Sequence, residues 1–203
     1  RSAYAALGRT VTTGELDKLI GLLVSPKSSK DIGFASGAID AVFKRTKDKS
    51  ACANALLKQL DGAKPVSNVV MLRLLPTVAT KQALPAVRSR VDSADDGVRD
   101  AAVRALVAWP NGDAGADLLN IVKTSKSKTY RVLSLRRYIE VTGGSKQLAE
   151  AMTLAERPDE KRMVLGKLPN DSTSVDVVAA ALDDAAVQRE AVQALIRIAE
   201  KIK

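Results

Sequence analysis

The chain has 203 residues, of which 46% are hydrophobic but only 3% aromatic, and its formal net charge is +9. It contains no histidine and one cysteine. This composition excludes an internal disulfide, a Ser–His–Asp or Cys–His nucleophile and most catalytic zinc sites. No segment reaches the ~18 consecutive apolar residues of a membrane-spanning helix. A core of Leu, Val, Ile and Ala favours closely packed helices.

Apolar residues recur with a helical period along the whole chain, and the predicted helices come in pairs after a short first helix over residues 1–9. The helix over 65–78 is expected to kink or stop early at Pro76. No alternating run bounded by turn residues occurs, so we predict no sheet. The first pair joins a helix capped at Thr12 or Thr13 and broken at Ser25-Pro26 to a partner over 29–45. The other five expected pairs are 51–60 with 65–78, 82–91 with 95–109, 114–122 with 128–141, 146–155 with 160–168, and 174–182 with 186–202.

The clearest helix is the stretch 95–109, DDGVRDAAVRALVAW. Its first two residues are carboxylates, which stabilise the start of a helix, and the sequence PNG follows its end. Its apolar residues form a single stripe. They are Val98, Ala102, Ala105, Leu106 and Trp109. We predict that Trp109 packs in the core; the alternative is a stacking platform for a sugar or a base.

The pattern V-R-x-x-A-x-x-A-L at 98–106 recurs, with substitutions, at intervals of about thirty residues. It aligns with 130–138, 160–168 and 187–195. A two-helix unit of this length cannot bury its apolar face alone, whereas stacked neighbours can. We therefore predict a solenoid of about six helix pairs with an N-terminal half repeat.

This pattern, preceded by acidic turn residues, resembles the HEAT repeat, in the short form found in bacterial phycobilin-lyase-like proteins. The resemblance implies an all-α, right-handed α-α superhelix over residues 1–203, a single domain whose second helices line the concave surface. Because neither end carries a clearly polar capping helix, we expect a piece excised from a larger protein. The closing segments also look like HEAT modules of environmental bacteria, many of them exported, which slightly favours an exported or periplasmic location.

In HEAT repeats, a turn aspartate and a helix arginine commonly bond between neighbouring repeats. The resemblance implies this role for Arg99, with Asp95 or Asp96, and for Arg131. Lys161 and Gln188 stand where the arginine is expected, so the ladder is predicted to be incomplete towards the C-terminus.

Other residues that could carry chemistry have simpler interpretations. Acidic pairs precede three second helices, at 95–96, 159–160 and 183–184, where capping explains them. The GGSK sequence at 143–146 follows a helix and lacks the spacing of a phosphate-binding loop. Cys52 is predicted to be a buried helix residue. We expect no catalytic residue, no cofactor and no metal.

Three arginines at equivalent positions of successive second helices suggest a binding surface. Arg73, Arg104 and Arg136 occupy the same position in three successive second helices, 31 and 32 residues apart. Equivalent positions of stacked repeats line up, so a row of cations is expected on the concave face, with Arg137 and Lys167 beside it. The alternative is an ordinary solvated helix face.

The sequence therefore predicts a non-catalytic scaffold that binds another protein or a neighbouring domain, with an acidic surface favoured by the positive charge. Two alternatives stay open. One is binding to the phosphate backbone of nucleic acid; the other is a phycobilin-lyase-like protein that handles a chromophore. The reasoning from shape to function rests on analogy between folds.

Overall fold

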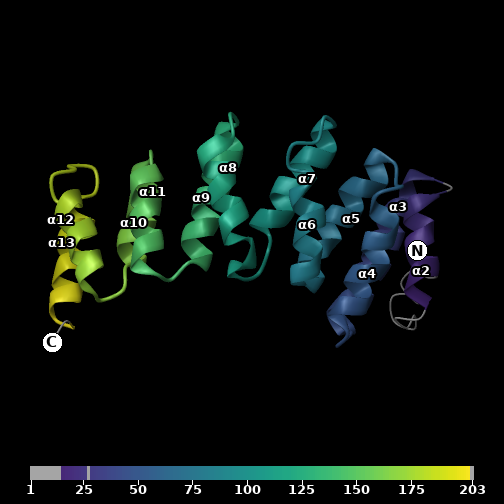
Figure 1. Cartoon of the computed structure of the whole chain (residues 1–203), viewed down its shortest axis with the longest axis horizontal. Coiled ribbons are helices and arrows are strands. Elements are labelled where there is room, and N and C mark those ends of the chain that lie inside the picture. Colours follow the sequence, from purple (N-terminus) through teal and green to yellow (C-terminus); the bar gives the residue numbers. More distant parts are fainter. Residues whose placement is uncertain (1–14, 27, 202–203) are drawn as a thin grey trace. The chain divides into compact units, whose positions relative to one another are not determined.

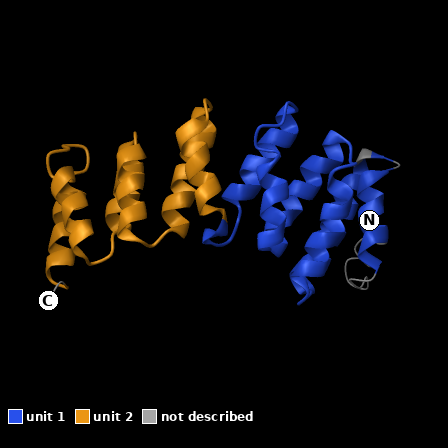
Figure 2. Cartoon of the chain, in the orientation of Figure 1, with its two compact units in different colours: residues 1–113 blue, residues 114–203 orange. Residues whose placement is uncertain are grey.

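The regular elements of the structure, a computed structural model, are all helical (Figure 1). The structure describes residues 15–26 and 28–201, and no strand occurs in these ranges. The short helix predicted over residues 1–9 lies outside the described residues. The helices group into two compact units, residues 1–113 and 114–203 (Figure 2). The single domain expected over 1–203 stays a prediction.

The described part of unit 1 contains three helix pairs. They are α2 (Leu16–Val24) with α3 (Ser29–Arg45), α4 (Lys49–Leu60) with α5 (Pro65–Val78), and α6 (Leu84–Arg88) with α7 (Asp96–Val107). The two helices of each pair pack together, and the second helices pack in chain order, α3 on α5 and α5 on α7. Among the first helices, α2 packs on α4, and α4 packs on the 3₁₀ turn Lys81–Ala83 before α6.

Unit 2 repeats this arrangement. Its pairs are α8 (Gly115–Thr124) with α9 (Lys128–Val141), α10 (Ser145–Leu154) with α11 (Pro158–Lys167), and α12 (Ser172–Ala181) with α13 (Gln188–Ala199). The second helices again pack in order, α9 on α11 and α11 on α13, while α10 packs on α12. Each unit is thus a short α-solenoid, and the predicted all-α class of stacked helix pairs is confirmed.

The helix predicted at 95–109 forms as α7, and the predicted apolar stripe is buried: Val98, Ala102, Ala105, Leu106 and Trp109 are all at most 6% exposed. The Asp95 carboxylate caps the helix by accepting a hydrogen bond of 2.9 Å from the N–H of Val98, as expected. Trp109 is fully buried just after the helix end, so its predicted core position is confirmed.

Two elements differ in detail from the sequence-based prediction. The helix expected over 82–91 is shorter in the structure. It spans only Leu84–Arg88, and turns follow it. Pro76 lies inside α5, where its ring removes one helical N–H; the helix ends two residues later, at Val78. Ala79 then takes a left-handed conformation (φ 46°) while its N–H bonds to the carbonyl of Leu75. The helix thus continues past Pro76 to its predicted end at Val78, and the early stop expected at Pro76 is not observed.

We expect the far-UV circular dichroism spectrum to be dominated by helix, because all the regular elements described are helical. A fitted strand content above about a fifth, which is typical of mixed globular proteins, would contradict the fold.

Candidate functional site

The predicted arginine row divides between the two units. In unit 1, Arg73 on α5 and Arg104 on α7 are both exposed, and their helices pack against each other. The Nε atom of Arg104 donates to the Asp100 carboxylate at 2.8 Å, one turn earlier on the same helix. Arg73 forms no ion pair with any residue in the described ranges. A charge that faces solvent without a partner is the one best placed to meet a ligand.

In unit 2, the three candidate cations are already engaged. Arg136 forms an ion pair with Asp159, in the first turn of the next second helix. Arg137 pairs with Glu140 at 2.9 Å. A continuous row of cations from unit 1 into unit 2 stays a prediction. In unit 2, ion pairs with Asp159 and Glu140 partly neutralise the charges of Arg136 and Arg137.

Lys167 points back towards the preceding repeat. Its ammonium donates hydrogen bonds to the carbonyl oxygens of Ile139, at 2.8 Å, and of Glu140. These carbonyls lie in the last turn of α9, where the helix dipole favours a positive charge. Lys167 therefore holds α11 against the end of α9.

Arg197 makes the equivalent contact one repeat later, and sequence reasoning did not select it. Its guanidinium donates to the carbonyls of Leu168 at 2.9 Å and Leu165 at 3.1 Å, at the end of α11. The signal was available, because Arg197 follows Lys167 by thirty residues, as Lys167 follows Arg137. Lys167 and Arg197 each cap the preceding second helix, whereas Arg137, at the same register, pairs with Glu140.

A second set of contacts links neighbouring repeats near the start of the second helices. Arg131 pairs with Glu156, and Lys161 pairs with Asp184 at 2.7 Å. Each acidic partner lies in the turn before the next second helix. The expectation that the ladder fails at Lys161 is therefore wrong, because an ammonium reaches this carboxylate as an arginine would. Arg99 instead bonds to Asp96 within its own helix.

Two aspartates of unit 2 have lowered pKa values. The hydrogen bond from Lys161 is the main cause for Asp184, with a further bond from the N–H of Ala186. The N–H of Ser174, at the start of α12, is the main cause of the lowered pKa of Asp171. In both cases the bonds favour the charged carboxylate.

These shifts predict acid sensitivity. Both folded-state pKa values lie below the unfolded value of about 3.9, so the stabilisation is complete above that pH and is lost as the pH falls through the folded-state values. Thermal melts between pH 5 and pH 2 should show a smaller drop in melting temperature for Asp184→Asn and Asp171→Asn than for the unchanged chain. Equal slopes for all three proteins would contradict this assignment.

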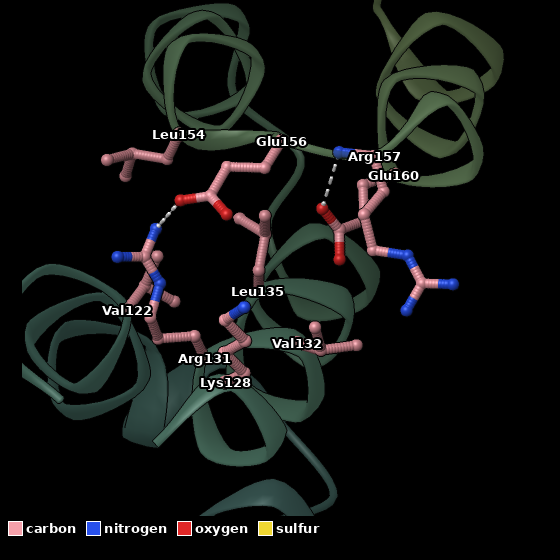
Figure 3. A pocket seen from close by; sticks show the side chains of 9 residues that line it. All are labelled: Val122, Lys128, Arg131, Val132, Leu135, Leu154, Glu156, Arg157 and Glu160. Atoms are coloured by element: carbon pink, nitrogen blue, oxygen red, sulfur yellow. Dashed lines mark hydrogen bonds and ion pairs between the residues drawn. The ribbon is translucent and has the colours of Figure 1, made fainter. Parts of the chain in front are cut away.

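Unit 2 also contains a pocket of about 230 Å³ (Figure 3). Its lining residues come from the ends of α8 and α10 and from the beginnings of α9 and α11. Four aliphatic side chains contribute to its wall: Val122, Val132, Leu135 and Leu154. Charged side chains complete it: Lys128, Arg131, Glu156, Arg157 and Glu160. Figure 3 shows the ion pair of Arg131 with Glu156 on one side of the pocket and Glu160 on the opposite side.

Glu160 is the unusual member of this pocket, because it is only 2% exposed. Its Oε2 atom accepts a hydrogen bond of 3.3 Å from the N–H of Arg157, at the start of α11. Its Oε1 atom is buried and accepts no hydrogen bond from any residue in the described ranges. The helix-capping role predicted for this carboxylate is therefore observed for one oxygen only.

Cys52 is a free, fully buried thiol, as predicted from its place in a run of small residues, and burial raises its pKa. Within the described ranges, no group of three or more Cys, Asp or Glu residues is placed to hold a metal ion. No described helix is long and apolar enough to cross a membrane.

Comparison with known proteins gives little further information. No protein-family model matches the chain, and no curated protein sequence does. Among solved structures, an engineered protein is similar at a TM-score of 0.48 and 17% identity, over 92% of this chain and 97% of that one. Human deoxyhypusine hydroxylase, in complex with glycerol, is similar at a TM-score of 0.29 and 14% identity, over 97% and 100% of the two chains.

Proposed function

We propose that this chain is a non-catalytic binding module of HEAT-like repeats, which presents the exposed sides of its second helices to another protein or to a neighbouring domain. The stacking of these helices in chain order is the observation that supports the proposal. Stacked repeats place equivalent residues next to one another, and this produces extended binding surfaces in solenoid proteins.

Charge favours an acidic partner. The chain carries a formal net charge of +9, which attracts anionic surfaces at long range. Arg73 contributes most directly, because it is exposed on α5 and forms no ion pair with another described residue. Arginine also suits carboxylates, since its planar fork can bond both oxygens. Arg104 and Arg136 are already paired with Asp100 and Asp159, which reduces the positive charge that each offers to an acidic partner.

The experiment compares retention on immobilised polyglutamate. Changing Arg73, Arg104 and Arg136 together to glutamate should abolish retention and leave the helical signal unchanged, with Arg73→Glu alone giving most of the loss. The matched control changes Lys123, Lys126 and Lys128 to glutamate, which alters the net charge equally and should matter less. Equal losses in both triple variants would mean that only net charge counts, which would contradict the proposed surface.

Nucleic-acid binding is the second candidate, favoured by the sequence pI of about 9.7. It predicts retention on duplex DNA that falls steeply with salt, because bound counterions are released. Retention on DNA but not on polyglutamate would favour this candidate. The phycobilin-lyase-like alternative predicts a coloured adduct on mixing with a bilin.

A further inference from the structure

The repeat pattern itself shows that Glu160 is out of place. The alignment of second helices puts it at the position of Val98 and Val187, which are 6% and 0% exposed, and of Tyr130, which is partly buried. An aliphatic residue at this position buries its side chain against the neighbouring helices. A carboxylate there loses most of its hydration, which is costly unless both oxygens find donors.

The protein supplies a donor for only one of these oxygens. Oε2 has the N–H of Arg157, and Oε1 has no partner within the described ranges. The side chain lines the pocket, and Figure 3 shows the second oxygen on the side away from the Arg157 N–H, towards Val132. A donor that enters the pocket can therefore complete the hydrogen bonds of a carboxylate that is otherwise only half satisfied.

The cations around the pocket do not fill this role. Arg131 is paired with Glu156, and Arg157 is paired with Asp159 through its Nε atom at 3.3 Å. Lys128 lines the pocket and is exposed, but it forms no ion pair with Glu160 in the structure. The rest of the pocket lining is aliphatic and consists of Val122, Val132, Leu135 and Leu154.

We propose that this pocket binds a primary alkylammonium group. The aliphatic part of such a ligand would pack on Val132 and Leu135, and its ammonium would donate a hydrogen bond to Oε1 of Glu160. A buried carboxylate and an ammonium form a charge-assisted hydrogen bond, which is stronger than a neutral one. This chemistry is found both in free amines and in the side chain of lysine.

The test is an NMR titration of the full chain with n-butylammonium chloride at constant ionic strength. We expect saturable shifts of amide signals in α9 and at the start of α11. Glu160→Gln should weaken binding about tenfold or more, because Gln keeps the shape and an acceptor but loses the charge. Asp176→Asn, on the exposed side of α12, removes the same charge elsewhere and should leave binding unchanged.

Val132→Phe provides a second variant, since it fills the pocket while Glu160 keeps its charge, and it should also weaken binding. An Nα-acetyl-lysine amide, titrated in parallel, identifies the source of the group. Binding of both ligands would indicate that a lysine side chain of another protein fits, whereas binding of butylammonium alone would indicate a free amine.

The proposal would be overturned by the absence of saturable shifts in the unchanged chain, or by equal affinities of the unchanged chain and Glu160→Gln. It would also be overturned if butylammonium bound to the Lys128→Ala variant but not to the unchanged chain, because this would mean that the ammonium of Lys128 is the partner of Glu160. If Val132→Phe bound butylammonium as tightly as the unchanged chain, the ligand would lie outside this pocket, and the proposal would again be overturned. None of these results depends on whether polyglutamate is bound.

Discussion

Replacing Leu106 with alanine is expected to lower the free energy of unfolding by about 2–5 kcal/mol, the range for a leucine removed from a packed core. Leu106 is fully buried in α7, the helix whose apolar stripe defines the repeat register. Its loss removes apolar contacts and leaves a cavity that the surrounding helices can fill only in part. Urea unfolding followed by circular dichroism measures the effect.

Leu22→Ala is the matched control, because this leucine is 37% exposed on α2. Because part of its side chain already faces solvent, its truncation should cost clearly less than that of Leu106. Leu106→Asp should be more damaging than Leu106→Ala, since it would bury an unpaired charge. If Leu106→Asp unfolds at the same urea concentration as the unchanged chain, the register of α7 is wrong.

Trp109→Ala is expected to cost about 3–5 kcal/mol, because it removes the largest of the fully buried side chains. Trp109 is also the only tryptophan of the chain. Trp109 follows the end of α7 with its side chain fully buried, so alanine would leave a large cavity. Thermal melting by circular dichroism gives the loss, and Trp109→Phe should recover part of it because an aromatic ring remains.

A stacking platform would behave differently. An exposed tryptophan that binds a sugar or a base contributes little to folding, and its removal would leave the melting temperature almost unchanged. Acrylamide quenching of the native fluorescence separates the two possibilities independently. We expect weak quenching in the folded chain and strong quenching after unfolding; strong quenching in both states would contradict the burial of Trp109.

The helices could be predicted from the sequence because their signals are local. The apolar stripe from Val98 to Trp109 and the cap at Asp95 lie within fifteen residues, and both are observed. The length of the helix before it was less predictable. The stretch 82–91 has helical periodicity, but its short helix ends at Arg88.

The partners of Lys161 and Lys167 were not predictable in the same way, because they come from other repeats. Lys161 finds Asp184, and Lys167 finds two carbonyls at the end of α9, each more than twenty residues away in the chain. A cation that looked available for a ligand can therefore serve to join two repeats. The thirty-residue spacing of Lys167 and Arg197 can be read from the sequence, but the function of the two cations is visible only from these contacts.

Glu160 illustrates the same limit for a carboxylate. An acidic residue near a helix start is usually an exposed cap, and the sequence 159–160 resembles the acidic pairs at 95–96 and 183–184. Burial depends on how α11 packs beside α9, which the local sequence does not specify. The alignment of Glu160 with Val98 was the available signal, since it puts a carboxylate at a core position.

Methyl–methyl nuclear Overhauser effects on an Ile, Leu and Val labelled sample test the stacking of second helices most directly. We expect cross-peaks between the methyl groups of α9, such as Leu135 and Ile139, and those of α11, and between α11 and Ile198 of α13. Unit 1 should give the same series from α3 through α5 to α7. Strong cross-peaks that join α9 directly to α13, with none from either helix to α11, would contradict the stacked-repeat fold.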